Sequence, residues 1–431
     1  MSEALEQSDL REGYKEVQFG PKTLVVPSEW SAERFGDVFH RRRESIDKIE
    51  DETVKYIGLK HLDSGRLDIN GYDEDGRERS SSRVFRQGDV LFGKLRPNLN
   101  KAAIAPFSGV CSSDILPIYA EEDARQQYLP YLMHSKLVRD RVVSTMEGTN
   151  LPRTSWGDLE KTLIPLPPLP EQRRIADILS TVDEQIQQTD EMIEKTEELK
   201  RGLMQSFFSG SDSKNTREVR FGSNLATIPV DWDVTTLSQV CKKIVDGPHS
   251  TPDYTDTGIP FVSAGDIENG EIDFENCKRI SEEDDNELRP RVDPQEGDIL
   301  LGKVGSGSLG KVCIVDTNRR FNIFVQLALL RPITGKILPG YLGTALQYRQ
   351  MQQQILDNAS GASMQYIGTG AIGNLEIPLP TIEEQKEISK GFGYIRQKIR
   401  QERKHKSKLQ ELKRGLMQDL LVGKVRVDPD D

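Results

Sequence analysis

The stretch GKVGSGSLGKV places Gly305, Gly310 and Lys311 at the spacing of a phosphate-binding loop, in which main-chain N–H groups and a lysine hold nucleotide phosphates. Such a loop needs Ser or Thr after the lysine to bind magnesium, and Val312 stands there instead. It must also lead into a helix, whereas the following KVCIVD is typical of a strand. We therefore do not expect this chain to hydrolyse nucleotides.

Other catalytic motifs also fail. An adenine methyltransferase carries a (D/N/S)PP(Y/F/W) motif that receives the flipped base, but the Pro167-Pro168 pair is followed by Leu169. A nuclease metal site needs a Pro-Asp pair near a (D/E)xK pair. The (D/E)xK pairs of this chain lie in segments that we expect to be long helices, except Asp212/Lys214 in the expected linker, which no Pro-Asp pair precedes. The five histidines form no evident cluster with serine and aspartate. The sequence predicts a chain without an active site of its own.

Three polar loops are candidates for binding a nucleic acid. Their side chains are of the kinds that donate hydrogen bonds to phosphates and base edges. The loops LFGKLRPNLNK, DGPHSTPDY and LGKVGSGSLGK supply Lys94, Arg96, Asn98, Asn100, Lys101, His249, Ser250, Thr251, Tyr254, Lys303, Ser306, Ser308 and Lys311. For any single residue, a solvated loop without a ligand is an equally good interpretation. Basic loops at matching places in both halves of the chain favour binding by the group.

The charge pattern is compatible with a local basic surface. A net charge of −11 argues against coating of polyanions without specificity, but the charge of a patch can differ from that of the whole. Residues 83–101 hold five basic residues against Asp89, and residues 396–408 hold seven against Glu402. We interpret the second run as a solvated helix face or a surface for a partner.

The chain repeats itself. ELKRGLMQ occurs at residues 198–205 and again at 411–418, and IPLPPLPEQRRI matches IPLPTIEEQKEI at the same spacing of 213. Further upstream the spacing falls to 209 for GDVLFGK and GDILLGK, and to 202 for VQFG and VRFG. Such a drift indicates a tandem duplication in which only the globular parts tolerate insertions. We predict globular domains over residues 1–163 and 214–376 and helical spacers over 164–213 and 377–431.

Each spacer is predicted to contain one long helix. The first helix should begin near Pro170 and end at Gly210. The second should begin with a Thr381–Glu384 capping box and end at Gly423. Heptad positions hold Ile175, Ile178, Val182, Met192, Leu199 and Leu203, widened by Leu179, Ile186 and Ile193, and in the second helix Ile388, Ile395, Leu409, Leu412 and Leu416, flanked by Phe392 and Ile399. Thr189, Thr196, Glu402 and His405 interrupt this seam and could fix its register. Two such helices at matching places favour pairing with each other over two separate amphipathic helices.

We predict a mixed α/β fold for the globular parts. Short β-type runs are KYIGLKHL, DVLFGKL, KAAIA and DILPIY in the first half, and IPFVSA, DILLGKV, KVCIVD and VQLALL in the second. One amphipathic helix is expected in each half, near residues 129–142 and 341–355. Residues 211–216 are the expected linker between the halves.

Bulk properties exclude several classes of protein. The chain of 431 residues is too long for one core, and the composition of 35% hydrophobic and 29% charged residues is typical of a globular protein. The first residues lack the features of a signal peptide, and no apolar run is long enough to span a bilayer. Cys111, Cys241, Cys277 and Cys313 stand alone, so we expect core thiols in a reducing cytoplasm and neither zinc nor disulfides.

Taken together, these residues resemble a known family. IPLPPLPEQRRIADIL with ELKRGLMQ, and IPLPTIEEQKEI with a second ELKRGLMQ, are similar to the repeats of specificity subunits of type I restriction-modification enzymes. DGPHSTPDYTDTGIPFVSAGDI and the GDVLFGK/GDILLGK pair resemble the target-recognition domains of that family. The resemblance covers nearly the whole chain.

The resemblance implies two target-recognition domains separated by two antiparallel helices and related by a pseudo-twofold axis. Each domain would read one half of a bipartite double-stranded DNA target. The helices would dock two methyltransferase subunits, and restriction subunits with translocase activity would join them. S-adenosylmethionine, ATP and magnesium would bind to those partners, with no cofactor in this chain. The Gly305–Gly310 loop differs from its match at 96–100, so the two half-sites should differ in sequence.

The sequence leaves two other functional hypotheses open. One is a specificity chain that serves a combined cleavage and methylation enzyme of another restriction type. The other is a coiled-coil scaffold without a role in DNA binding, which salt-dependent binding of the partner-loaded complex to duplex DNA would exclude.

Overall fold

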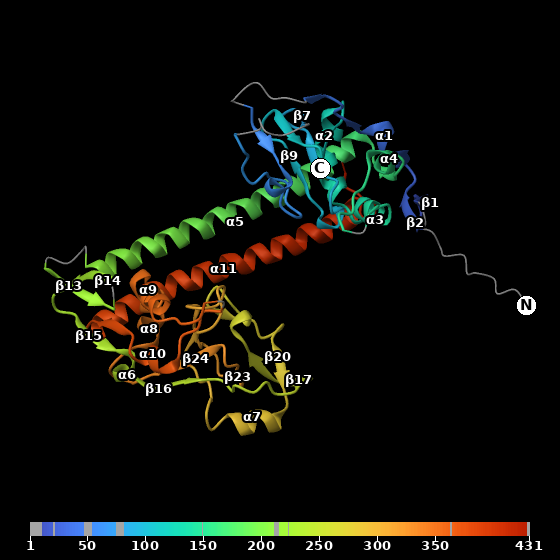
Figure 1. Ribbon diagram of the computed structural model, residues 1–431. Coiled ribbons are helices and arrows are strands. Elements are labelled where there is room, and N and C mark those ends of the chain that lie inside the picture. The colour runs from blue at the N-terminus through green and yellow to red at the C-terminus, as the bar shows by residue number, and fades with distance from the viewer. Residues whose placement is uncertain are drawn as a thin grey trace, which may run out of the picture. The chain divides into compact units, whose positions relative to one another are not determined.

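The computed structural model describes residues 11–19, 22–46, 54–74, 82–148, 150–210, 215–222, 224–362 and 364–428. The chain divides into two compact units. Unit 1 comprises Met1–Asp190 and Lys404–Asp431, and unit 2 comprises Glu191–Arg403. Each unit thus contains a globular part and portions of two long helices, α5 (Leu169–Ser209) and α11 (Ile382–Leu420) (Figure 1). Among the described residues, none of the helices has an apolar stretch that could cross a membrane.

The described part of unit 1 is built on two four-stranded sheets. The first has the order β4-β11-β8-β9, over His40–Arg41, Ile115–Tyr119, Val90–Gly93 and Ala102–Ile104. The second has the order β5-β7-β10-β6, over Ser45–Ile46, Ser82–Phe85, Gly109–Ser112 and Tyr56–Ile57. Two further strand pairs are β1 (Tyr14–Phe19) with β2 (Lys22–Pro27), and β12 (Leu163–Leu166) with β3 (Ser31–Arg34).

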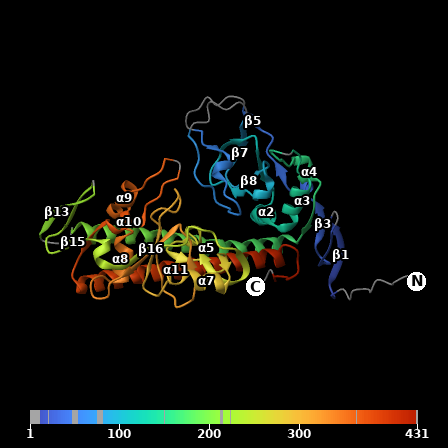
Figure 2. The ribbon, with the colours of Figure 1, turned by 60° about the horizontal axis from the view of Figure 1, so that its bottom comes forward.

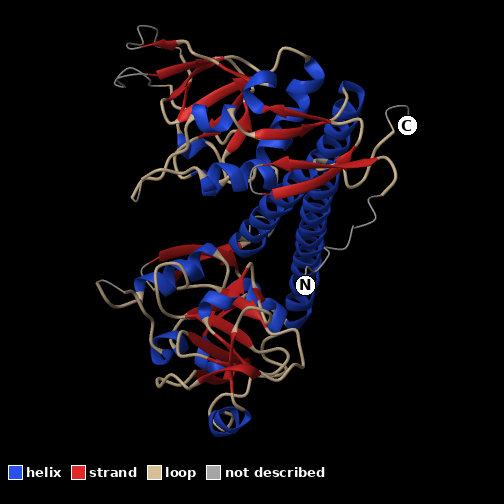
Figure 3. Cartoon of the chain, turned by 90° about the vertical axis from the view of Figure 1, so that its right-hand side faces the viewer, coloured by secondary structure: helices blue, strands red, loops and turns tan. Residues whose placement is uncertain are grey.

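Unit 2 repeats the first of these sheets. Its order β16-β24-β21-β22, over Cys241–Asp246, Leu327–Pro332, Ile299–Gly302 and Val312–Ile314, matches β4-β11-β8-β9 strand for strand. A three-stranded sheet β20-β17-β23 covers Lys278–Ile280, Tyr254–Val262 and Asn322–Ile323. The remaining pairs are β13 (Thr216–Phe221) with β14 (Asn224–Pro229), β15 (Asp233–Thr236) with β25 (Glu376–Leu379), and β18 (Ile267–Glu268) with β19 (Glu271–Ile272). The predicted mixed α/β fold is confirmed (Figure 3).

Short helices connect the strands in both units. They are α1 (Phe35–Val38), α2 (Asp123–His134), α3 (Lys136–Ser144), α4 (Trp156–Glu160), α6 (Leu237–Val240), α7 (Glu282–Leu288), α8 (Pro339–Ala345), α9 (Arg349–Asp357) and α10 (Thr369–Gly373), with 3₁₀ turns η1 (Leu59–His61), η2 (Pro97–Leu99) and η3 (Ala264–Asp266). The single helix that we predicted near 129–142 is wrong, because the chain there forms α2 and α3. Ser135 separates them with extended backbone, and its hydroxyl caps α3 at Val138 N.

The predicted helix near 341–355 is wrong for the same reason. There α8 and α9 are separated at Tyr348, which is also extended. Helices α8 and α9 both belong to unit 2 (Figure 2). They pack on the end of α5, where the Phe208 ring lies 4.7 Å from the Tyr348 ring and 5.9 Å from the Tyr341 ring. The break lets two short helices follow the surface of the long one.

The long helices pair in antiparallel fashion within each unit. In unit 1, Lys413 forms an ion pair with Asp183 at 2.5 Å, and Lys406 forms one with Asp190. Moving seven residues toward the end of α5 therefore means moving seven residues toward the start of α11, so the helices run in opposite directions. In unit 2, Arg403 bonds Glu197 at 2.5 Å. The prediction that the two helices pair with each other is confirmed.

Part of the predicted seam is wrong. Met192, Leu199 and Leu412 were placed in it, yet their side chains are 47%, 55% and 50% exposed. On α5 the stripe follows the positions that we expected to widen it: Leu179 is buried and Ile186 and Ile193 are half-buried, each four rather than three residues after Ile175, Val182 and Thr189. His405 is exposed and so does not interrupt the seam. Thr189, another predicted interruption, is buried, and ion pairs on the flank of the seam link the two helices.

The starts of the two helices are built alike. Trp30 Nε1 donates to Glu171 at 2.9 Å, and its match Trp232 donates to Glu384 at 3.2 Å. Glu384 also accepts from Thr381 N at 3.0 Å, which confirms the predicted capping box. At the other ends, Gly210 and Gly423 have positive φ, as predicted for residues that end a helix. The four cysteines are buried and free.

Candidate nucleic-acid interface

The first candidate loop joins β8 to β9 in unit 1. Arg96 and Asn100 flank η2 with left-handed backbone, at φ of 50° and 49°. Arg96 and Asn98 are exposed, and Asn100 is half-buried. Lys101 is engaged inside the unit, since its Nζ donates to the main-chain oxygen of Leu59 at 2.9 Å. This loop therefore offers Arg96 and Asn98 to a ligand most directly.

Lys94, at the start of the same loop, lies among other cations. Burial lowers its pKa and the charges of Arg83, Arg153 and Arg41 lower it further, while Asp114 acts in the opposite direction. The Asp114 carboxylate lies 3.8 Å from Lys94 Nζ and 3.0 Å from Arg153 Nε. We call the following set the cationic face of unit 1: Arg41, Arg43, Arg83, Lys94, Arg96 and Arg153. Carboxylates also lie at this face: Asp114 pairs with Lys94 and Arg153, and Glu44, Glu121 and Glu160 lie beside Arg41. The guanidinium groups of the face can still bind phosphate groups.

A hollow of about 460 Å³ lies at one side of this face, lined in part by His40, Arg41, Arg43, Tyr119 and Trp156. The Arg41 guanidinium lies 5.9 Å from the centroid of the Trp156 ring. Its Nε is buried without a hydrogen-bond partner among the described residues. Our sequence reasoning missed this hollow, although the run HRRR at residues 40–43 was its visible signal.

The second candidate loop, in unit 2, is held from below by a buried carboxylate. Asp246 ends β16 and is bonded by Lys303 Nζ at 2.5 Å and by Arg291. Burial acts to raise the pKa of Asp246, but the hydrogen bonds and charges of Lys303 and Arg291 outweigh it and lower that pKa. Lys303, which the sequence suggested as a contact for DNA, is itself buried. Its position makes it a support for the loop.

Above Asp246 the loop exposes a different kind of surface. His249, Ser250 and Thr251 are exposed, and the Tyr254 side chain is 47% exposed. The His249 ring lies 3.4 Å from Asp246, which ties the loop to its support. Our sequence reasoning missed Tyr366, which is exposed. Its backbone forms an isolated β-bridge with Val304, and Arg153 forms the matching β-bridge with Leu95 in unit 1. The matching positions thus hold an arginine in one unit and a tyrosine in the other.

The third candidate loop, 303–311, is a compact turn. Its N–H groups are used internally: Ser308 and Leu309 donate to Gly305 O, and Gly310 donates to Gly302 O. A Cβ on Gly302 would lie 1.9 Å from Ser308 O, so this glycine allows the turn to close. Ser306 is exposed and Ser308 half-buried, whereas Lys311 Nζ donates to Ile267 O at 2.9 Å. The chain continues into β22, as predicted, and not into a helix.

Known proteins resemble this chain along most of its length. The model of the family described as type I restriction modification DNA specificity domain matches residues 27–198 and 229–411. The MjaVIII specificity subunit of a type I restriction enzyme from Methanocaldococcus jannaschii is 25% identical over 427 residues, covering 96% of this chain and 97% of the relative. The EcoBI specificity subunit from Escherichia coli is 28% identical over 242 residues, covering 53% and 50%.

Solved structures show the same fold. The S subunit of a type I restriction-modification system from M. genitalium superposes with a TM-score of 0.59 at 16% identity, covering 91% of this chain and 96% of that one. A chain from a type I R-M system, solved to explain its assembly and conformational transition, gives a TM-score of 0.50 at 24% identity, covering 93% and 99%.

Proposed function

The chain belongs to the family of type I restriction modification DNA specificity domains, and we propose that it selects the DNA sequence on which a type I restriction-modification complex acts. The observation that carries this proposal is the use of one sheet order with two different sets of exposed side chains. Unit 1 offers its cationic face, whereas unit 2 offers His249, Tyr254 and Tyr366. Two such units suit a target in two parts that differ in sequence, so we infer an asymmetric bipartite site.

The residues of each unit divide into two tasks. Guanidinium and ammonium groups of the cationic face other than Arg96 hold phosphates and so fix the position of the duplex. Arg96, Asn98 and the loop 249–254 reach base edges, which carry the sequence information. Lys303, Lys101 and Lys311 support these loops from inside, as their hydrogen bonds to internal oxygens indicate.

Helices α5 and α11 serve as seats for two methyltransferase subunits. Leu199 and Leu412 hold the same place in the repeated ELKRGLMQ and are both about half exposed. Exposed leucines at matching places suit equal apolar contacts with two copies of one partner. Restriction subunits with translocase activity complete the complex.

The chemistry belongs to the partners. S-adenosylmethionine, ATP and magnesium bind to the methyltransferase and restriction subunits, and this chain binds double-stranded DNA without a catalytic step. The missing catalytic motifs in the sequence support this division. The complex works in the cytoplasm, where the DNA is.

Mapping of methylated adenines tests the proposal. The chain is produced with its methyltransferase subunit in cells that lack other adenine methyltransferases. We expect one asymmetric bipartite sequence to be methylated, and we expect Leu199→Asp with Leu412→Asp to abolish the methylation by removing both seats. Methylation without any sequence preference would refute the proposal, and so would undiminished methylation by the double variant.

A further inference from the structure

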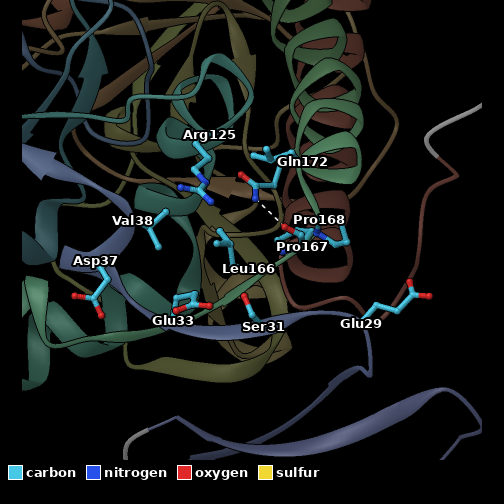
Figure 4. A pocket seen from close by; sticks show the side chains of 11 residues that line it. Glu29, Ser31, Glu33, Asp37, Val38, Arg125, Leu166, Pro167, Pro168 and Gln172 are labelled. Atoms are coloured by element: carbon cyan, nitrogen blue, oxygen red, sulfur yellow. Dashed lines mark hydrogen bonds between the residues drawn. The ribbon is translucent and has the colours of Figure 1, made fainter.

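A cavity of about 360 Å³ lies within unit 1 where β3, α1 and the start of α5 meet. Arg125 and Gln172 line one part of it, and Ser31, Glu33 and Asp37 line another (Figure 4). All of its lining comes from unit 1. The function proposed above does not use this cavity.

Two buried polar atoms in this cavity have no hydrogen-bond partner among the described residues. Gln172 is 1% exposed; its Nε2 donates to Pro167 O at 2.7 Å, but its Oε1 accepts nothing. Arg125 bonds Glu122 through Nη1, and its Nε donates to nothing. A buried polar group without a partner is costly and uncommon, so a missing donor and a missing acceptor in one cavity point to a ligand.

Unit 2 shows what satisfies the same glutamine. Gln385 matches Gln172 at the spacing of 213. Its Oε1 accepts from the main-chain N of Leu338 at 2.9 Å, and its Nε2 donates to Lys336 O and Pro380 O. The group that reaches this oxygen is therefore an N–H of a passing main chain. In unit 1 the corresponding chain is already helical, because α2 begins at Asp123, and its N–H groups are used within the helix.

The charge of the cavity adds a second requirement. The carboxylates of Glu33 and Asp37 make no hydrogen bond or ion pair with the described residues, whereas Glu29 is paired with Arg426 at 2.8 Å. At the matching places in unit 2, at the spacing of 202, stand the uncharged residues Thr235 and Gln239. The unpaired negative charge is thus particular to unit 1, and it favours a cationic side chain on the ligand.

We propose that this cavity binds a non-helical segment of the methyltransferase subunit that carries a lysine or arginine. A main-chain N–H of the segment donates to Gln172 Oε1, a main-chain oxygen accepts from Arg125 Nε, and the cationic side chain pairs with Glu33 and Asp37. The methyltransferase subunit is the occupant because Pro167 and Pro168 at the cavity wall lead directly into α5, its proposed seat. In unit 2 the chain fills the equivalent place itself, so only one of two bound copies makes this contact. The inference rests on the function proposed above.

Photo-crosslinking in the assembled complex tests the contact. A benzophenone amino acid replaces Asp37, and in a matched control it replaces Gln239, which is likewise exposed. We expect position 37 to crosslink to a methyltransferase peptide that contains lysine or arginine, and position 239 to give no such product. Equal crosslinking from both positions, no crosslink from position 37 in a complex that assembles and methylates, or a crosslink to a restriction subunit or DNA would each overturn the inference. If no complex forms even with the unmodified chain, the proposed function fails as well.

Charge reversal tests the same contact by affinity. Glu33→Lys with Asp37→Lys should weaken binding of one methyltransferase copy by tenfold or more and leave the other unchanged, so that titration stops at one copy per chain. Thr235→Lys with Gln239→Lys is the control and should leave both binding steps unchanged. Replacing the crosslinked lysine or arginine of the partner by glutamate should restore binding to the reversed cavity and weaken binding to the original one. Unchanged titration of the first variant, or failure of the rescue, would refute the pairing.

Discussion

In unit 1 the loop after β8 carries Lys94 and Arg96 beside Arg153, whereas in unit 2 the loop after β21 carries Lys303 and Gly305 beside Tyr366. The sheets below these loops have the same strand order. Lys94 lies among cations with Asp114 at 3.8 Å, but Lys303 is neutralised by a buried carboxylate at 2.5 Å. One scaffold thus presents charge in the first unit and hydroxyl and aromatic groups in the second.

This difference shows how a repeated sheet can present two different surfaces without a change in strand order. The lysine of GDVLFGK is half-buried with Asp114 at 3.8 Å, whereas the lysine of GDILLGK is buried against Asp246 at 2.5 Å and supports the loop from inside. Glu44 stands where Asp246 stands, at the spacing of 202, but it is exposed and bonds Arg86. Four measurements can test this comparison. They concern the buried Asp246–Lys303 pair, the stability of each unit in acid, the glutamines at the starts of α5 and α11, and the proposed DNA contacts of Arg96 and Tyr366.

The largest effect is expected for Asp246→Ala. The variant leaves the Lys303 ammonium buried without a counter-charge, and breaking one side of a buried pair typically costs about 3–5 kcal/mol. Hydrogen exchange of β16 and β21 peptides should show this loss of stability in unit 2. The matched variant Glu44→Ala should change unit 1 by less than about 0.5 kcal/mol, because its ion pair is exposed. Adding Lys303→Met to Asp246→Ala should recover much of the lost stability. A similar small change of stability in all variants would contradict the conclusion that the Asp246–Lys303 pair supports the loop.

Acid should weaken unit 1 before unit 2. The pKa of His134 is lowered to about 4, mainly by burial and with a smaller contribution from the charge of Lys413, against the effects of Ala102 O and Asp183. An unfolded histidine titrates near 6.5, so between about pH 6.5 and 4 the unfolded state binds a proton that the folded state does not. Stability is therefore complete above about pH 6.5 and falls by roughly 2–3 kcal/mol as the pH drops to 4.

Unit 2 has Thr344 at the place of His134, at the spacing of 210. Hydrogen exchange of α2 and α8 peptides at pH 7 and pH 4.5, corrected for intrinsic rates, should show the loss in α2 only. His134→Thr should abolish it. An equal acid response of the variant would mean that other groups of unit 1 cause the effect.

The helix starts should respond unequally to the same substitution. Gln385→Met removes bonds to Leu338 N, Lys336 O and Pro380 O and should cost about 1–3 kcal/mol. Gln172→Met removes one bond to Pro167 O but also an acceptor without a partner, so its effect in the isolated chain should be within about 1 kcal/mol. Denaturant unfolding of both variants measures the difference. Equal losses would indicate that Gln172 Oε1 is satisfied in solution, for instance by water.

The pairing of the long helices could be predicted because it follows from local pattern and repetition. The exact seam could not, since apolar residues stand both three and four residues after Ile175 and after Thr189, and either choice gives a heptad. The choice is made by the partner helix, where Lys413 and Lys406 bond Asp183 and Asp190. The break at Ser135 depends on a side-chain cap, and the break at Tyr348 depends on packing against Phe208 of α5; the amphipathic pattern of the sequence shows neither.

The loops of the candidate interface could be found from residue type, but not their tasks. Lys303 looks like a surface lysine until Asp246, 57 residues earlier, is placed beside it. Arg41, Arg83 and Arg153 come from segments far apart in sequence, so no spacing rule brings them to Lys94. What unites them is the strand order of the sheets, which residue type alone does not specify.

The smallest effect, and the most direct on function, concerns the two DNA surfaces. Arg96→Ala and Tyr366→Ala should each weaken binding of the partner-loaded complex to its mapped target by about threefold to tenfold, or roughly 1 kcal/mol. The salt dependence of binding distinguishes the two variants, because loss of a phosphate contact reduces the slope of log K against log salt by about 1, whereas loss of an uncharged ring leaves it unchanged.

The sequence dependence of binding distinguishes two possible contacts of Arg96. Loss of a base-edge contact relaxes the preference at one position of one half-site by about 1–3 kcal/mol, whereas loss of a phosphate contact weakens binding to all sequences alike. Titration against duplexes that vary one base at a time, at several salt concentrations, measures both quantities. If Arg96→Ala alters neither affinity nor salt slope, the loop after β8 does not touch DNA, and the contrast between the units must be sought at Arg41 and Arg43 instead.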